Sequence, residues 1–219
     1  MKLRQWCMAA LCAALLPQVA WAAQAEITVT GWTVSWPSAP LAEARVNADL
    51  AVQLAEAQAE ATAIDTGYQE SLQEYPDTMM YSYRSETAPA VETDRYLVMR
   101  TWEERYCGGA HGDYGEYYVV YDKHTGHRVS VSQLAGELPE TLHPKLEHLT
   151  VSELERRDIT DFSIWGEYIH DLFAPDAEIN YTLTEDGHVE LVFNPYEVGP
   201  YMLGIVRIEV PSEMIAPVK

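Results

Sequence analysis

The sequence is poor in basic residues. Lys and Arg together number 14 of 219 residues, against 34 Asp and Glu, so the formal net charge is −20. A chain with so few basic residues, and no basic patch, is not expected to bind nucleic acid. The acidity favours either simple solubility or a partner of opposite charge.

Cysteine is also scarce, since the chain has three, of which Cys7 and Cys12 lie close to the N-terminus. If the first residues are removed after export, Cys107 has no intramolecular disulfide partner. An unpaired cysteine in an oxidising compartment is expected to be buried, reactive or bonded to another molecule.

Long hydrophobic runs are absent except at the N-terminus. There, Lys2 and Arg4 precede the apolar stretch WCMAALCAALLPQVA, which is followed by Ala20-Trp21-Ala22. This order is typical of a signal peptide over residues 1–22, and the run is too short for a membrane anchor. The remaining chain is therefore predicted to be periplasmic or secreted, without a membrane span. Loss of the two basic residues would bring its net charge to about −22.

No glycine-rich phosphate loop opens a helix, because CGGAHG at residues 107–112 precedes a predicted strand. Zinc-like spacing is present in Cys107, His111, His124 and His127. However, the predicted strand over residues 117–122 would hold the two pairs roughly 17–20 Å apart. We therefore predict no metal site and no cofactor.

A nucleophile system built from Cys107, His111 and Asp113 is a second interpretation of the same stretch. No helix N-terminus follows to lower the pKa of the thiol or to form an oxyanion hole. The favoured interpretation is a small, half-buried cysteine at a strand end, with His111 capping backbone groups in the turn. No catalytic residue is assigned, and a Cys–His hydrolase stays as a third functional alternative.

Hydrophobic periodicity predicts an α+β fold. Apolar residues at steps of three and four predict one long helix from about residue 40 to residue 72, with Gly67 as a candidate break. Alternation predicts strands at 27–36, 79–87, 95–106 and 116–122, followed by HRVSV at 127–131. A shorter helix is expected over 139–158 and a short helical turn over 162–173. A hairpin with Asp186-Gly187 at its tip and a last strand before Pro211 complete the pattern.

The expected architecture is an antiparallel β-sheet with one long N-terminal helix and a shorter helix packed on a face. Residues 23–219 are taken as a single domain, with an N-terminal half at 23–105 and a C-terminal half at 106–219.

The segment NPYEVGPYMLG at residues 194–204 lies between two strands and combines two prolines with two tyrosines. Such a loop loses little entropy on ordering and offers large contact areas. It could cover one end of a sheet, or it could be a preorganised binding loop.

The motifs YCGGAHG and YDKHTGHRVSVSQL, followed by LVFNPYEVGPYMLGIVRIEVP, resemble the RsiV-like extracytoplasmic domain. That domain occurs in a lysozyme-sensing anti-sigma factor and in the non-catalytic part of some peptidoglycan deacetylases. The upstream VSWPSAPLAEARVNADLAVQL, with Asn47 in its helix, is similar to the segment that precedes the domain in this family.

The resemblance implies binding rather than catalysis, because the family domain captures lysozyme in the anti-sigma factor. We therefore expect a basic protein such as a lysozyme-type muramidase as the partner, with peptidoglycan as the alternative. The candidate binding residues are His111, Tyr196, Glu197, Pro200 and Tyr201. Stacking on sugars would use surface aromatic residues such as Trp32, Trp36 and Trp165.

Overall fold

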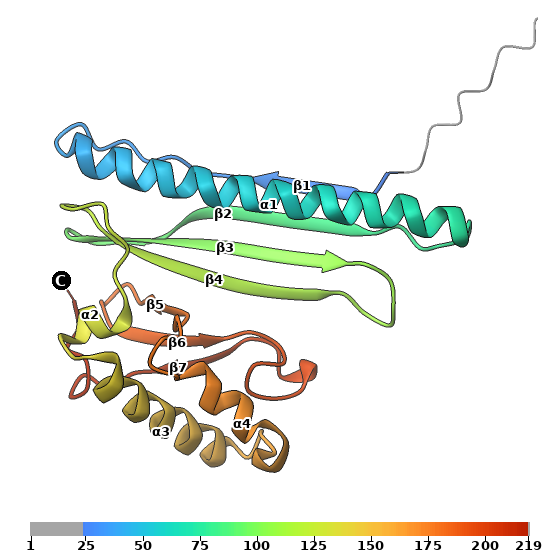
Figure 1. Cartoon of the computed structure of the whole chain (residues 1–219). Coiled ribbons are helices and arrows are strands. Elements are labelled where there is room, and N and C mark those ends of the chain that lie inside the picture. The colour runs from blue at the N-terminus through green and yellow to red at the C-terminus, as the bar shows by residue number, and fades with distance from the viewer. Residues whose placement is uncertain (1–23, 219) are drawn as a thin grey trace, which may run out of the picture.

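The computed structural model describes residues 24–218, so the predicted signal peptide lies outside the described part of the chain. In Figure 1, α1 lies along a four-stranded sheet, and a three-stranded sheet lies on the other side with α3 and α4 beyond it. The elements along the described residues are β1 (Glu26–Thr30), α1 (Pro40–Glu74), β2 (Ser82–Glu92), β3 (Tyr96–Tyr106), β4 (Asp113–Asp122), α2 (Val131–Ala135), α3 (Pro139–Arg157), α4 (Phe162–Leu172), β5 (Tyr181–Leu183), β6 (Val189–Phe193), the 3₁₀ helix η1 (Tyr201–Leu203) and β7 (Val206–Glu209).

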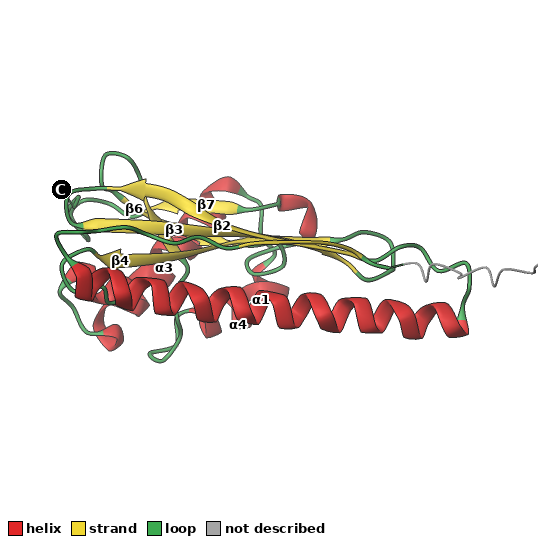
Figure 2. Ribbon diagram, turned by 90° about the horizontal axis from the view of Figure 1, so that it is seen from above, coloured by secondary structure: helices red, strands yellow, loops and turns green. Residues whose placement is uncertain are grey.

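Helix α1 has 35 residues and is therefore about 52 Å long. It begins at Pro40, whose fixed φ suits the first helical position, and it ends where Tyr75 becomes extended before Pro76. The helix continues through Gly67 without a break. Figure 2 shows α1 running beside the long strands β2, β3 and β4 for most of their length.

The four-stranded sheet has the order β1-β2-β3-β4, and β1 is parallel to β2 while the other pairs are antiparallel. The predicted strand over 27–36 is shorter than expected, because its ladder ends at Thr30. Beyond that point the side chain of Asn47 accepts a hydrogen bond from the Val34 N–H (2.8 Å) and donates one to the Val34 carbonyl (3.0 Å). The amide of Asn47 thus replaces a neighbouring strand.

The two faces of β3 contact different parts of the protein. Leu97 and Met99 pack with Val46 of α1, whereas Tyr96 and Val98 pack against the C-terminal half. This division confirms the alternation that the sequence predicts.

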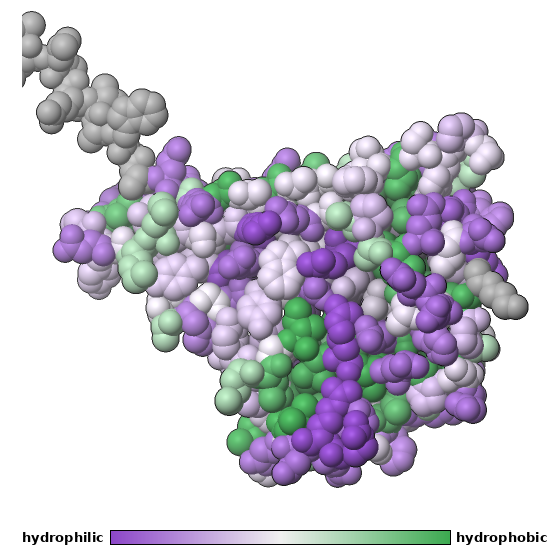
Figure 3. Space-filling view, turned by 180° about the vertical axis from the view of Figure 1, so that it is seen from behind, coloured by the Kyte–Doolittle hydropathy of each residue, from purple (hydrophilic) through white to green (hydrophobic). Residues whose placement is uncertain are grey.

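The three-stranded sheet has the order β5-β6-β7 with antiparallel pairing throughout. The hairpin at Asp186-Gly187 is confirmed, and Gly187 adopts a φ of 81° that favours glycine. The α+β class is also confirmed, although the strands divide between two sheets instead of forming one. On the face seen in Figure 3, hydrophobic residues gather over the lower, C-terminal half and are crossed by a band of hydrophilic residues.

Two asparagines join the sheets along the outer edge of β4. Asn180 accepts from the Tyr118 N–H (3.0 Å) and donates to the Glu116 carbonyl (2.7 Å). Asn194 accepts from the Glu116 N–H (2.8 Å). These amides satisfy backbone groups that a fifth strand would otherwise pair, so the edge of β4 is closed without one.

A charged network lies beside this junction. The Glu116 carboxylate contacts the Arg100 guanidinium (Nε to Oε1, 3.1 Å) and the Arg207 guanidinium, and it accepts from the Tyr118 hydroxyl (3.0 Å). Arg207 also pairs with Glu190 (2.9 Å). Because Glu116 is only 9% exposed, these partners offset the cost of burying its carboxylate.

The strand predicted over HRVSV is wrong beyond Arg128, which makes one isolated bridge to Tyr121. Ser130 instead caps α2: its hydroxyl accepts from the Gln133 N–H, and the Gln133 side chain accepts from the Ser130 N–H. The S-x-x-Q spacing of this capping box overrides the β propensity of the valines.

Candidate functional site

The loop between β6 and β7 is held from inside by Glu197. Its carboxylate accepts a hydrogen bond from the Asn194 N–H (2.6 Å), and Thr160 donates to the Val198 carbonyl (2.9 Å). Burial raises the pKa of Glu197, although its hydrogen bonds to Asn194 act in the opposite direction. Glu197 therefore orders the loop rather than presenting a free carboxylate to a partner.

Tyr196 has a φ of 71°, which is uncommon for a residue other than glycine. Its side chain is nevertheless 48% exposed, so burial of the ring does not account for the strained backbone. Strain of this kind persists where the surrounding structure enforces it, and it is concentrated at functional sites. Pro200 is exposed and precedes η1, which carries Tyr201.

The β3–β4 turn brings His111 to the same place. Gly108 and Gly109 have φ values of 90° and 98°, a backbone conformation that favours glycine in the turn. The Nδ1–H of His111 donates to the Gly112 carbonyl (2.8 Å), which leaves Nε2 as the acceptor that faces the Tyr196 hydroxyl at 3.4 Å.

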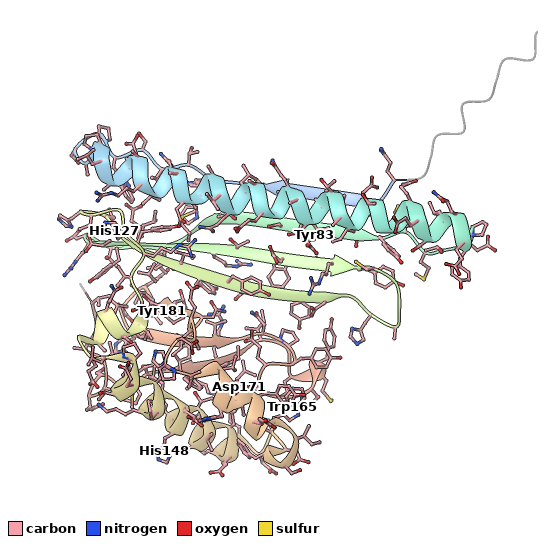
Figure 4. The ribbon with its side chains drawn as sticks, in the orientation of Figure 1. Tyr83, His127, His148, Trp165, Asp171 and Tyr181 are labelled. Carbon is pink, nitrogen blue, oxygen red and sulfur yellow. The ribbon has the colours of Figure 1, made fainter. Side chains whose placement is uncertain are left out.

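Aromatic rings from three separate regions of the chain meet here. The His111 ring stacks on Tyr201 with centroids 4.1 Å apart, and Tyr114 meets Tyr201 edge-on at 5.7 Å. Tyr196 lies 5.6 Å from Tyr201 and 6.5 Å from Trp165 of α4. We call these five residues the aromatic surface; Trp165 marks its α4 side in Figure 4.

Two further rings extend the aromatic surface. Trp102 stacks on Tyr114 (5.4 Å), and Tyr168 lies 5.7 Å from Trp165. Tyr168 is 61% exposed, and the neighbouring apolar side chains of Ile164 and Met202 are 59% and 87% exposed. Contiguous exposed aromatic and apolar groups are typical of an interaction site.

Acidic residues lie beside the rings. Partial desolvation and the neighbouring groups, among them Tyr114, Asp113 and Glu104, raise the pKa of Tyr201. The Asp113 carboxylate is half exposed and pairs with Arg105 at 3.4 Å, while Glu104 is exposed. Two acidic side chains therefore lie beside the aromatic surface, and one of them is paired with Arg105.

The structure brings His111, Tyr196, Pro200 and Tyr201 into one region, as the sequence grouped them, and places Glu197 beneath the loop. Sequence reasoning missed Tyr114, Trp102 and Tyr168. The sequence indicates Trp165 only as a residue that could stack on sugars, together with Trp32 and Trp36. Nothing in the local patterns of these residues indicates that three elements converge at this point.

Cys107 is exposed rather than half-buried, which corrects the prediction from the sequence. Partial desolvation of the thiol nevertheless raises the pKa of Cys107, with Arg105 acting in the opposite direction. A nucleophilic cysteine requires a lowered pKa. The His111 ring is occupied by Tyr201 and the Gly112 carbonyl, so the geometry does not supply a Cys–His pair.

The strand between the two candidate ligand pairs is present as β4, Asp113–Asp122. Among residues 24–218, no group of three His, Cys, Asp or Glu residues is placed to hold a metal ion. In the same part of the chain, no helix is long and apolar enough to cross a bilayer.

Residues 143–213 match the family described as "Protein of unknown function (DUF3298)". The matched segment runs from α3 past β7 and supplies Trp165, Tyr196 and Tyr201 to the aromatic surface. No curated protein matches the chain.

Two solved structures of DUF3298 proteins are similar to this one. A protein from Pseudomonas aeruginosa PAO1 has a TM-score of 0.50 at 17% identity, over 69% of this chain and 68% of that chain. A protein from Bacteroides fragilis has a TM-score of 0.49 at 21% identity, over 80% and 72%. At these identities the likeness to the first protein concerns the fold alone.

Proposed function

We propose that this chain is an exported, non-catalytic recognition protein that binds a basic cell-wall enzyme, most specifically a lysozyme-type muramidase. The aromatic surface is the observation that carries this proposal. It would supply the anchor contacts, and the acidic groups around it would attract the partner.

Aromatic residues on a rigid support are suited to this role. Tyr and Trp dominate the binding energy of protein interfaces because each covers a large area with few rotatable bonds. Here Tyr196 and Tyr201 belong to a loop that Glu197 and Thr160 hold in one conformation. A loop that is ordered before binding loses less entropy when the partner arrives.

The chemical class of the partner follows from charge. The whole chain has a formal net charge of −20, and Glu104 and Asp113 lie next to the rings. Opposite charge accelerates association and favours basic partners over acidic ones. The muramidase itself is named from the resemblance of YCGGAHG and NPYEVGPYMLG to the RsiV-like domain.

The test is a titration of residues 23–219 with purified lysozymes of different structural classes, followed by calorimetry and a muramidase inhibition assay. We expect the Tyr196→Ala, Tyr201→Ala pair to weaken binding by at least about 30-fold, or about 2 kcal/mol. Trp32→Ala is the matched control, because Trp32 is 47% exposed but lies outside the aromatic surface.

Two results would overturn the proposal. Absence of binding to every lysozyme class at low salt would exclude a lysozyme as the partner. Binding that the tyrosine pair does not weaken, while the circular dichroism spectrum is unchanged, removes the aromatic surface as the site.

A glycan is the second candidate ligand, because the exposed rings of Tyr168 and Tyr196 could stack on sugars. Sedimentation with purified sacculi separates the two proposals. Co-sedimentation that depends on these tyrosines, without lysozyme binding, would favour the glycan.

A further inference from the structure

The contact between α1 and the four-stranded sheet is not continuous. Val46 and Leu50 form one apolar cluster with β3 and β4, and Ala61 and Ile64 form another with Tyr83 of β2. Between the two clusters lies a cavity of about 410 Å³ that is open to solvent on one side. Figure 4 shows Tyr83 near this interval, between α1 and the sheet.

Both walls of the cavity become polar at the same level. On α1, the position that continues the apolar stripe after Leu50 is Gln53, and the next is Ala57, whose side chain is too small to reach the sheet. On the sheet, the apolar Leu97 and Met99 give way to hydroxyl and charged groups. The lining consists of Gln53, Glu56, Ala57, Glu60, Tyr83, Ser85, Thr87, Thr101, Glu103, Arg105 and Tyr117.

A helix that only had to pack would carry a large apolar side chain at position 57, because an unfilled space loses dispersion contacts. Instead, α1, β2, β3 and β4 all contribute polar groups around one space. The volume lies within the range of about 300–1,000 Å³ that is usual for small-molecule sites.

The lining carries an excess of negative charge. Glu56, Glu60 and Glu103 contribute three negative charges against the single positive charge of Arg105, which gives −2. Arg105 is shared between Glu60 (3.7 Å) and Asp113 (3.4 Å), so its charge is already engaged.

The negative charge of the lining contributes to raising the pKa of the two tyrosines in the cavity. Burial, and then the negative charge of Glu103, raises the pKa of Tyr83 to about 12. The same two causes, in the same order, raise the pKa of Tyr117. Tyr83 donates to Glu103 (3.1 Å), and Ser85 beside it is only 2% exposed, so the carboxylate lies on a polar floor.

The spacing of the carboxylates around the cavity distinguishes between a metal ion and an organic cation as the ligand. A bare metal ion needs several oxygen ligands within about 2.0–2.6 Å. In the described part of the chain no three acidic or metal-binding side chains are grouped for that purpose. Carboxylates spread around a space of this size, with hydroxyls between them, match a ligand that has several separated donor groups.

We propose that the cavity between α1 and the four-stranded sheet binds a small organic cation that carries ammonium or guanidinium groups. Glu103 on the floor, together with Glu56 and Glu60 on the helix, would accept hydrogen bonds from the cationic groups. The hydroxyls of Ser85, Thr87 and Thr101 would contact the linker between them. This site does not depend on the proposed recognition function.

The probes are spermidine and agmatine, of which agmatine carries both an amine and a guanidinium. Uncharged 1,4-butanediol is the control ligand. Calorimetry in about 0.15 M salt screens attraction to the general acidity of the protein over distances beyond about 8 Å. We expect saturable binding at one site, about tenfold weaker in Glu103→Gln.

Two variants complete the test. Glu70→Gln removes an exposed acid of α1 outside the cavity and should change the affinity less than about twofold. Ala57→Leu should weaken binding by narrowing the space while the thermal midpoint is retained. Heats that do not saturate, or equal effects of Glu103→Gln and Glu70→Gln, would overturn the proposal, as would full binding by a folded Ala57→Leu protein.

Discussion

The two faces of the four-stranded sheet are packed in different ways. Toward the C-terminal half, Val98 and Val120 belong to one continuous apolar core with α3, α4 and the second sheet. Toward α1, the apolar residues form two small clusters with a polar cavity between them. The first face therefore provides most of the hydrophobic stabilisation, and the second leaves open space at the surface of the fold.

The largest expected effect comes from truncating one leucine on each side of the four-stranded sheet. Leu191 is fully buried in the continuous core, and Leu191→Ala should lower the free energy of unfolding by about 2–5 kcal/mol. Leu50→Ala beneath α1 should fall near the lower end of that range, because its cluster is small and next to the cavity. Urea denaturation measures both, and equal losses would show that the two faces contribute alike.

Glu116 tests the polar junction of the two sheets. Glu116→Ala leaves Arg100 and Arg207 without their shared carboxylate, and we expect a loss of about 2 kcal/mol after allowance for the partial exposure of both arginines. Glu86→Ala, which removes the exposed pair with Arg84, should change stability by less than about 0.5 kcal/mol. A similar loss in both variants would contradict a special role for Glu116.

Asn47 tests the attachment of α1 to the segment after β1. Asn47→Ala removes both hydrogen bonds to Val34 and should cost about 1–2 kcal/mol. Gln58→Ala is the control, because Gln58 lies on the solvent-exposed side of α1. If chemical denaturation shows no difference between the two variants, the amide does not stabilise the segment.

The smallest expected effect concerns the pH dependence of stability, which should have opposite signs for Asp122 and Glu197. Burial would raise the pKa of Asp122, but the Arg95 guanidinium and the N–H groups of Thr125 and His124 outweigh it and lower the pKa. Its contribution is therefore present above the unfolded pKa near 3.8 and is lost as pH falls through the lower folded value. The pKa of Glu197 is raised instead, so deprotonation disfavours the folded state as pH rises from about 4.5 through the folded value.

The free energy of unfolding, measured between about pH 2.5 and pH 7, checks both signs, because carboxyl groups titrate within roughly this range. The loss caused by Asp122→Asn should be greatest at neutral pH and should shrink in acid. For Glu197→Gln, the wild type should be relatively more stable at the acidic end. Parallel curves for the two comparisons would contradict the assignment of their environments.

Much of the fold could be predicted because its signals are local. The three- and four-residue steps of α1, the alternation of residues 96–101 and the Asp186-Gly187 turn each lie within one element. The division into two sheets could not be predicted, because it depends on Asn180 and Asn194 satisfying the edge of β4 from positions about 60–80 residues away.

The candidate site could be predicted only in part, because some of its residues have a local sequence signal and others do not. Tyr196 and Tyr201 stand out in a proline-containing loop, and His111 stands out in a glycine turn. Tyr114 and Tyr168 look like ordinary residues of a strand and a helix, and only tertiary packing places them near the loop. The role of Glu197 beneath the loop depends on a hydrogen bond to Asn194 that no spacing rule indicates.

The amides that close the edge of β4 also make the junction sensitive to chemical ageing. Deamidation of Asn180 would replace the Nδ2 donor, which now faces the Glu116 carbonyl at 2.7 Å, with an oxygen that repels it. The Glu116 carbonyl would then keep only the longer bond from the Asn194 amide (3.3 Å), and the junction of the two sheets would be weakened.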